Sequence, residues 1–176
     1  MTQTRPSAMT HRQFMDAFGD VYEHSPWVAE ALWPAAPSGV YDEPGAMAAA
    51  MRETVDAATE PAKLALIRAH PELAGRAAVA GEMAEASKRE QSGAGLDQCT
   101  PEEYADFQQL NRAYADKFAF PFIVAVKGMT RADILGAFRA RLANDTEAEF
   151  EEAMRQIHRI AGFRLEALFA VEGEAA

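Results

Sequence analysis

Apolar residues recur at helical spacing along most of this chain, with polar residues between them. In the first such stretch, Thr10-His11-Arg12-Gln13 has the form of a capping box, in which the threonine and glutamine side chains bond the helix start. Phe14, Ala17, Phe18 and Val21 follow at steps of three and four. This pattern predicts a helix over residues 10–21.

The same kind of pattern, with its own start and stop signals, predicts helices along most of the chain. Thr100 with Pro101 and Glu103 is the strongest start signal, and Thr130 with Asp133 and Thr146 with Glu149 are similar. The stretch 34–45 holds four prolines and two glycines, so we expect an irregular connection there. Further helices are expected after Ser25-Pro26 and over 46–58, 61–70, 76–91, 100–118, 130–142 and 146–170.

Strand signals are nearly absent. Residues 120–128, Phe-Pro-Phe-Ile-Val-Ala-Val-Lys-Gly, form the only β-like run, and Pro121 and the lack of a second strand argue against a sheet. We interpret this run as a buried extended segment. The predicted fold class is therefore all-α, a compact single-domain bundle of about eight helices that covers residues 1–176, with flexible first and last few residues.

Composition and charge exclude some classes of protein. A net charge of −10 without a basic cluster argues against nucleic-acid binding. No signal peptide or peroxisomal address is evident, and no apolar run approaches the roughly 20 residues of a membrane span. The single cysteine, Cys99, fits a reducing compartment, so we expect a cytoplasmic protein. The acidic run Glu147–Glu152 is interpreted as the solvated start of a helix.

Three helices carry a polar residue where the apolar stripe should continue. His70 lies four and three residues after Leu66 and Ile67, so we expect its imidazole on the buried face of the last helical turn. On the helix expected over 76–91, the stripe Val79, Met83 and Ala86 leads to Glu90. A carboxylate there is unfavourable, because it is buried and lies at the negative end of the helix dipole.

Arg164 is the third such residue. It lies seven residues after Ile157 and four after Ile160, in the inward sector of the last helix. Each residue alone has a structural explanation: a hydrogen-bonded core histidine, a glutamate that leans to solvent, and a structural ion pair. Together, an imidazole, a carboxylate and a guanidinium can form an acid–base site for an anionic substrate.

A metal site is not expected. His11, His24 and His158 are placed on polar helix faces or helix ends, and they lack the spacing of paired metal ligands.

Two longer motifs contain these residues. The runs Ala69-His70-Pro71-Glu72-Leu73-Ala74-Gly75 and Ser87-Lys88-Arg89-Glu90-Gln91-Ser92-Gly93-Ala94-Gly95-Leu96 strongly resemble the OHCU decarboxylase family, as do Phe120–Ile123 and Ile157–Leu165. OHCU is 2-oxo-4-hydroxy-4-carboxy-5-ureidoimidazoline, an intermediate of urate breakdown, which the family converts to (S)-allantoin and carbon dioxide. The resemblance covers essentially the whole chain and is looser in its N-terminal third.

The resemblance implies roles for residues of this sequence. His70 and Glu90 would be catalytic, and Arg164 would bind substrate. Pro71, Ser87 and Gln91 match positions that line the pocket, and Phe122, Ile123 and Val124 match a segment whose backbone bonds the substrate ring. The resemblance also implies an all-α homodimer without a metal or organic cofactor.

Two other functions remain open at this point. A noncatalytic helical module could use the same pocket to sense a ureide ligand, with His70 and Glu90 in a buried hydrogen bond. A purely structural helical subunit would leave the inward Glu90 and Arg164 unexplained.

Overall fold

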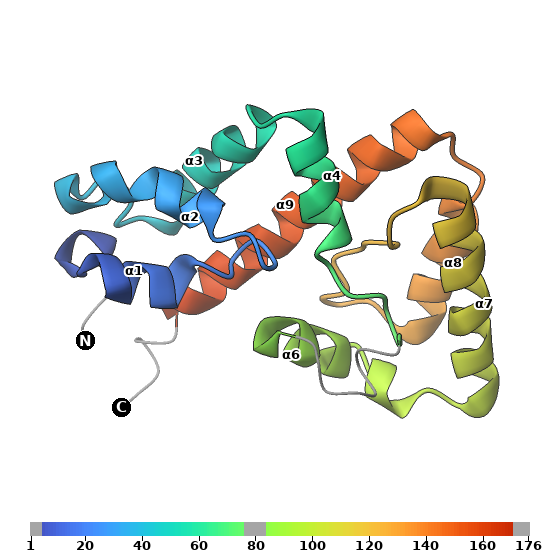
Figure 1. Ribbon diagram of the computed structural model, residues 1–176. Coiled ribbons are helices and arrows are strands. Elements are labelled where there is room, and N and C mark those ends of the chain that lie inside the picture. The colour runs from blue at the N-terminus through green and yellow to red at the C-terminus, as the bar shows by residue number, and fades with distance from the viewer. Residues whose placement is uncertain (1–4, 76–83, 171–176) are drawn as a thin grey trace. The chain divides into compact units, whose positions relative to one another are not determined.

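The computed structural model describes residues 5–75 and 84–170, which form helices joined by turns and one extended segment (Figure 1). These residues contain eight α-helices, three short 3-10 helices and no strand, so the all-α prediction is confirmed. The chain ends that we expect to be flexible, residues 1–4 and 171–176, lie outside the described residues.

The chain divides into two compact units, Met1–Leu66 with His158–Ala176, and Ile67–Ile157. Helix α4 (Glu60–Arg68) ends just inside the second unit. The long helix α9 (Thr146–Ala170) gives its first half to the second unit and its second half to the first.

The first unit is built around α2, which contacts α1, α3 and the 3-10 helix η2. The predicted capping box of Thr10 and Gln13 is confirmed at the start of α1. The expected irregular stretch 34–45 is wrong in part, because η2 occupies its first residues and α3 begins at Pro44, where a helix needs no N–H. The elements before α4 are η1 (Pro6–Ala8), α1 (His11–Phe18), α2 (Trp27–Leu32), η2 (Trp33–Ser38) and α3 (Pro44–Asp56).

Side chains at helical spacing form the core of this unit. On α1 the rings of Phe14 and Phe18 are both buried and lie 5.1 Å apart. On α3 the buried positions are Met47, Met51 and Val55, each four residues after the last. Their burial supplies the hydrophobic free energy that holds these short helices in place.

The second unit holds the remaining helices. Helices α7 and α8 lie side by side (Figure 1), and the predicted capping boxes at Thr100 and Thr130 are confirmed at their starts. At the start of α9 the prediction is wrong: the Asp145 carboxylate, and not Thr146 with Glu149, accepts a bond from the Ala148 N–H. The elements between α4 and α9 are α6 (Glu85–Gly93), η3 (Leu96–Gln98), α7 (Pro101–Phe118) and α8 (Arg131–Arg141).

An aromatic cluster forms the core of the second unit. The buried ring of Tyr114 on α7 lies within 6.0 Å of the rings of Phe118, Phe120, Phe122 and Phe138. Residues 122–126 are extended and buried, and no strand among the described residues pairs with them. The prediction of a buried extended segment is confirmed.

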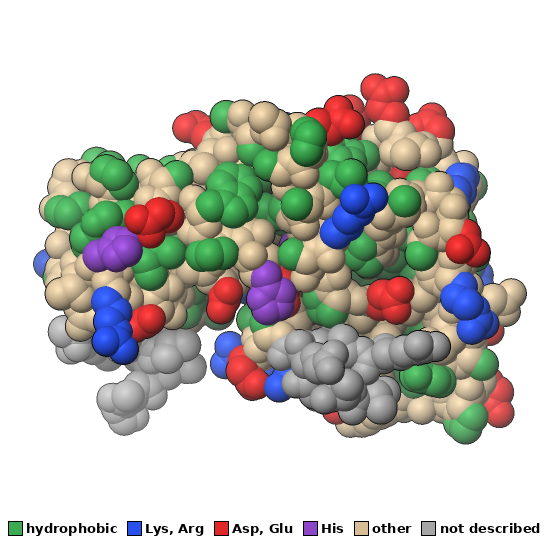
Figure 2. Space-filling model, viewed as in Figure 1, with side chains coloured by type: hydrophobic (Ala, Val, Ile, Leu, Met, Phe, Trp, Pro, Cys, Tyr) green, Lys and Arg blue, Asp and Glu red, His purple; other side chains and the backbone are tan. Residues whose placement is uncertain are grey.

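On the face shown in Figure 2, Lys and Arg side chains lie scattered among acidic ones and do not gather into a basic patch. Among the helices that the structure describes, none is long and apolar enough to cross a bilayer.

Candidate active site

His70 lies just beyond the end of α4, in the second unit. The helix ends at Arg68, and the His70 N–H donates to the Ile67 carbonyl at 3.2 Å. Pro71 disfavours helical backbone at the residue before it, which accounts for the early end. The expected burial of His70 is confirmed, with 8% of the residue exposed, but the predicted helix end is wrong by two residues.

A tight loop, residues 71–75, follows His70. Within it, Ala74 has a left-handed backbone with φ of 48°. A Cβ at Gly75 would lie 2.7 Å from the Cβ of Glu72, which real Cβ contacts do not show. Only glycine therefore fits at the end of this loop.

Gln91 of α6 ties its helix to this loop. Its side-chain oxygen accepts a hydrogen bond from the Ala74 N–H at 3.0 Å, and its amide nitrogen donates to the Glu72 carbonyl at 3.2 Å. Gln91 was expected to line the substrate pocket. These two contacts show that it fixes the loop next to His70.

Two more amide side chains reach the loop from α7. The Gln108 amide nitrogen donates to the Ala74 carbonyl at 2.8 Å, and the Asn111 amide nitrogen donates to the Leu73 carbonyl at 2.9 Å. Asn111 is buried, and sequence reasoning gave it no role. Peptide groups of three consecutive residues, Glu72, Leu73 and Ala74, thus form hydrogen bonds with side-chain amides.

Helix α6 differs from the expected helix over 76–91. Ala84 has an extended backbone with ψ of 148°, so the helix begins at Glu85. The stripe residues Val79 and Met83 lie outside the described residues. The prediction for Glu90 assumed continuous helical spacing from Val79 to Glu90, and the extended backbone of Ala84 interrupts that spacing.

On α6 itself the buried positions are Ser87 and Gln91, one helical turn apart. Glu90 flanks them and is half-buried, so its predicted place at the buried end of an apolar stripe is wrong. Pro71 is also half-buried. A half-buried carboxylate needs less compensation than the fully buried one that we expected.

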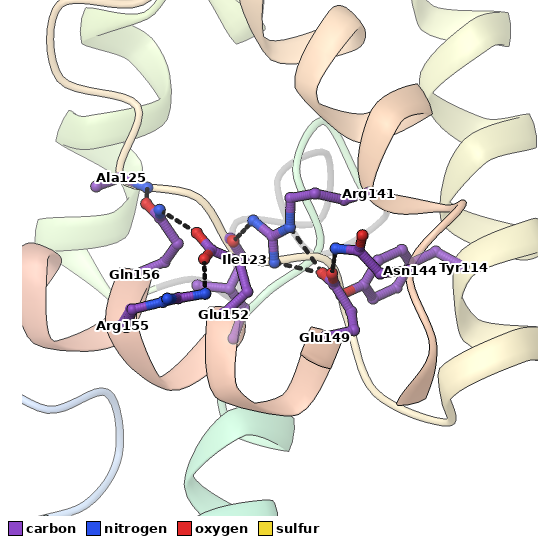
Figure 3. A network of polar contacts seen from close by, with 9 residues as sticks. All are labelled: Tyr114, Ile123, Ala125, Arg141, Asn144, Glu149, Glu152, Arg155 and Gln156. Carbon is purple, nitrogen blue, oxygen red and sulfur yellow. Dashed lines mark hydrogen bonds and ion pairs between the residues drawn. The ribbon is translucent and has the colours of Figure 1, made fainter. Parts of the chain in front are cut away.

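Neighbouring residues fix the extended segment that contains Phe122–Val124, and Figure 3 shows the contacts of Ile123 and Ala125. The Phe122 ring stacks on Phe138 with centroids 3.9 Å apart. The Ile123 carbonyl accepts a 2.6 Å bond from Arg141 of α8, and the next residue, Ala125, donates its N–H to Gln156 of α9 at 3.0 Å. This extended segment, which pairs with no strand in the described part of the chain, is thus held by side chains on two helices.

Arg141 belongs to a buried network that sequence reasoning missed. Its guanidinium pairs with Glu149 at 2.5 Å, and the Glu149 side chain is 0% exposed. Glu149 also accepts hydrogen bonds from the Tyr114 hydroxyl and, at 2.8 Å, from Asn144 (Figure 3). Burial, reinforced by the contact with Glu149, raises the pKa of Tyr114 far above its usual range.

The acidic run was therefore interpreted wrongly at Glu149, whose carboxylate is inside the second unit. The sequence did carry a signal for Arg141. It lies seven residues after Ile134 and three after Phe138, both buried, and this is the same criterion that selected Arg164.

Arg164 lies on the part of α9 that belongs to the first unit, and it is buried as expected. Its guanidinium forms a 2.8 Å ion pair with Glu23, whose side chain is 0% exposed. It also donates to the carbonyls of Asp20 and Val21, at 3.2 and 3.4 Å. Glu23 follows the end of α1 and lies off its apolar stripe, so no periodicity identified it.

His158 forms a second polar cluster in the first unit, although it was placed on a polar face. Its side chain is 9% exposed, with Nδ1 2.8 Å from the Tyr22 hydroxyl and Nε2 3.1 Å from Asp56 Oδ1. Burial lowers the pKa of His158, although Asp56 opposes this effect. In the described part of the chain, no group of three or more His, Cys, Asp or Glu could hold a metal ion.

The predicted site residues thus fall into two sets. One set lies in the second unit: His70, Pro71, Ser87, Glu90, Gln91, Phe122, Ile123 and Val124. Of these, the structure links Gln91 directly to the loop after His70. Arg164 lies in the first unit.

Comparison with known proteins gives consistent results. The family model described as OHCU decarboxylase matches residues 7–166. A 2-oxo-4-hydroxy-4-carboxy-5-ureidoimidazoline decarboxylase of Halalkalicoccus jeotgali is 43% identical over 156 residues, which cover 89% of this chain and 85% of that protein. A protein of the same name from Haloferax volcanii is 38% identical over 98% of both chains.

One solved structure is also similar. A crystal structure of (S)-allantoin synthase superposes with a TM-score of 0.73 at 33% identity and covers 93% of this chain. It matches 52% of that chain, so this protein spans about half the length of the synthase.

Proposed function

Because this chain belongs to the OHCU decarboxylase family, we propose that it converts OHCU to (S)-allantoin and carbon dioxide in urate breakdown. The observation that carries the proposal is the family match over residues 7–166. That range includes His70, Glu90, Arg164 and every other residue to which a role is assigned below. We treat residues 1–176 as one functional domain.

The substrate supplies its own electron sink. When the bond from C4 to the carboxylate breaks, the electron pair forms a C4=C5 double bond, and the C5=N pair moves onto nitrogen, which takes a proton. The 4-hydroxyl then loses its proton as C4 becomes a carbonyl, and a proton is added to C5. Protonation of one face gives the S product, so the chemistry places no demand on an external electron sink.

We assign the proton-transfer chemistry to His70. Its imidazole would bond the 4-hydroxyl beside the departing carboxylate, and histidine suits this task because its ordinary pKa of about 6.5 lies near working pH. A well-placed acid or base contributes roughly 10²- to 10⁴-fold to a rate. The burial of His70 and the fixed loop after it support this role, since both limit the positions of the imidazole.

The other predicted site residues would orient His70 or bind the substrate. Glu90 would set the tautomer and charge of His70, as carboxylates do for imidazoles in other sites. Arg164 would hold an anionic or carbonyl oxygen of the substrate in its planar fork. Ser87, Gln91 and Pro71 would line the pocket, and the peptide groups of Phe122, Ile123 and Val124 would bond the ring.

The test generates OHCU from urate in the presence of the protein and follows the circular dichroism of the allantoin that forms. We expect rapid formation of the S enantiomer. His70→Ala and His70→Asn should both lose most activity and keep the fold. Racemic allantoin formed no faster than in buffer would contradict the proposal, and full activity in His70→Asn would remove histidine from proton transfer.

The noncatalytic sensor makes a different prediction. It would bind allantoin in calorimetry without turning over OHCU, whereas an enzyme must accelerate the reaction.

We further propose that the protein acts as a homodimer in the cytoplasm. The family resemblance supports the dimer, and the single free cysteine is consistent with a reducing compartment. Light scattering after size-exclusion chromatography should give twice the mass of one 19.2 kDa chain.

A further inference from the structure

The short loop that follows His70 is held by hydrogen bonds at both of its ends. The His70 N–H bonds the end of α4, and three residues later the Leu73 carbonyl accepts a bond from Asn111. Between them, Pro71 has a ring-locked φ and Glu72 is bonded by Gln91. With both sides anchored and a proline between, the backbone of His70 has little freedom to move.

Two of the loop's anchors come from α7, a helix on which no residue was predicted to belong to the site. Gln108 and Asn111 are three positions apart, so they face the same side of the helix. They donate to adjacent carbonyls, those of Ala74 and Leu73. Ala74 has a left-handed backbone that a non-glycine residue rarely adopts, and these bonds stabilise that conformation.

Asn111 is costly if its only purpose is packing. It is buried, and its side-chain oxygen makes no hydrogen bond with any residue that the structure describes. A leucine of similar size would bury no amide there. The orientation of the amide is fixed, because a flipped group would set an oxygen against the Leu73 carbonyl.

We propose that Asn111 and Gln108 are positioning residues that set the place of the His70 imidazole through the 71–75 loop. The proposal rests on the decarboxylase function proposed above. Neither residue needs to touch substrate. Loss of either bond shifts the imidazole relative to the reacting atoms. Arg164, Ser87 and the peptide groups of Phe122–Val124, which are proposed to bind substrate, lie on other elements, so turnover falls more than affinity.

The experiment compares Asn111→Leu, Gln108→Met and a matched control, Gln109→Met. Gln109 is the next residue on α7 and is exposed. We expect kcat to fall by about 10- to 100-fold in Asn111→Leu, as for a catalytic group misplaced by a fraction of an ångström to 1 Å. Gln108→Met should show a smaller fall, KM should change little in both, and Gln109→Met should match the parent protein.

A second readout does not depend on activity. The imidazole signals of His70 are identified in nitrogen-15 NMR spectra by their loss in His70→Asn. In Asn111→Leu and Gln108→Met these signals should shift, and those of His11, His24 and His158 should stay in place. Thermal melting shows whether each variant folds, and if Asn111→Leu does not, the half-buried Gln108→Met decides.

Unshifted His70 signals in a folded variant would overturn the proposal, whatever the rate. Parent-like kcat in both variants would overturn it as well. If the unmodified protein lacked decarboxylase activity, the proposed function would fail, and the NMR comparison would still show whether these residues position His70.

Discussion

Each unit of this protein contains an arginine paired with a buried glutamate, and the arginine side chains are 7% exposed in the first unit and 11% exposed in the second. In the first unit Arg164 pairs with Glu23, and in the second Arg141 pairs with Glu149. Both glutamate side chains are 0% exposed, and both arginines also donate to main-chain carbonyls. By geometry alone the two arginines are close to equivalent.

The second pair is tied to the aromatic core of its unit. Glu149 also accepts bonds from Tyr114 and Asn144, and the Arg141 guanidinium lies over the Phe122 ring at 4.5 Å. The Arg141 pair is thus enclosed by residues of the aromatic core and fixes the backbone of Ile123. An inward arginine on a helix therefore does not by itself identify a substrate-binding residue. Whether an arginine binds substrate or only stabilises the fold is decided by measuring the stability and the activity of its variants separately.

The largest expected effect is on stability. Arg141→Met leaves the Glu149 carboxylate buried without its cation, and loss of one partner of a buried pair costs about 3–5 kcal/mol in the free energy of unfolding. Urea denaturation measures this loss. Arg139→Met on the same helix, where the ion pair with Asp106 is exposed, should cost at most about 1 kcal/mol. Equal losses in the two variants would show that the buried network does not stabilise the fold.

The next effect concerns Arg164. In the double variant Arg164→Met/Glu23→Gln no unpaired charge stays buried, so most of the stability lost in Arg164→Met alone should return. Turnover should not return: we expect kcat/KM about 10²-fold below the parent, the order expected for losing a charged bidentate contact. Recovery of both activity and stability would make Arg164 a structural residue like Arg141.

A smaller effect is expected at Asn144, which donates to Glu149. Asn144→Ala removes one of several bonds to a buried carboxylate, and hydrogen bonds to charged groups are worth about 1.5–3 kcal/mol. Because Asn144 is half-buried, the loss should lie near the lower end of that range. Chemical denaturation measures it, with Gln109→Ala as the exposed amide control. A loss as large as that of Arg141→Met would show that the network fails as a unit.

The smallest effect is a pH dependence in the first unit. Burial lowers the folded-state pKa of His158 below its unfolded value of about 6.5, so the unfolded chain binds more protons as the pH falls. This contribution to stability is fully present above about pH 6.5 and is lost as the pH falls toward the folded-state pKa. Melting curves from pH 7.5 to 5.5 should show a smaller decrease for His158→Gln than for the parent.

His11→Gln is the control for that measurement, because His11 is about half exposed. If the parent instead gained stability relative to His158→Gln as the pH fell, the Asp56 carboxylate would outweigh burial, and the sign of the shift would be reversed.

The sequence was sufficient for the parts of this structure that depend on local patterns. Capping boxes at Thr10, Thr100 and Thr130 gave three helix starts, and the burial of His70 and Arg164 followed from spacing. These succeed because capping and amphipathic spacing involve residues within a few positions of each other.

The failures have a different physical origin. The stripe that placed Glu90 assumed one continuous helix, and the extended backbone of Ala84 breaks it. Glu149 looked like a capping residue, yet its partners Tyr114 and Arg141 come from other helices, 35 and 8 positions away. Local spacing cannot show whether a carboxylate bonds its own helix or a guanidinium brought near by the fold.

The extended segment at Phe122–Val124 has a consequence for how this protein can change over generations. Its side chains are buried and packed, whereas its proposed contacts with substrate come from peptide groups. Peptide groups are the same in every residue except proline, so exchanges among apolar residues of similar volume would alter packing without removing a donor or acceptor. Substrate recognition by main-chain groups is thus insensitive to substitutions of the side chains in this segment. We expect variants from a library of apolar substitutions there to keep the substrate preference of the parent protein while their stability varies.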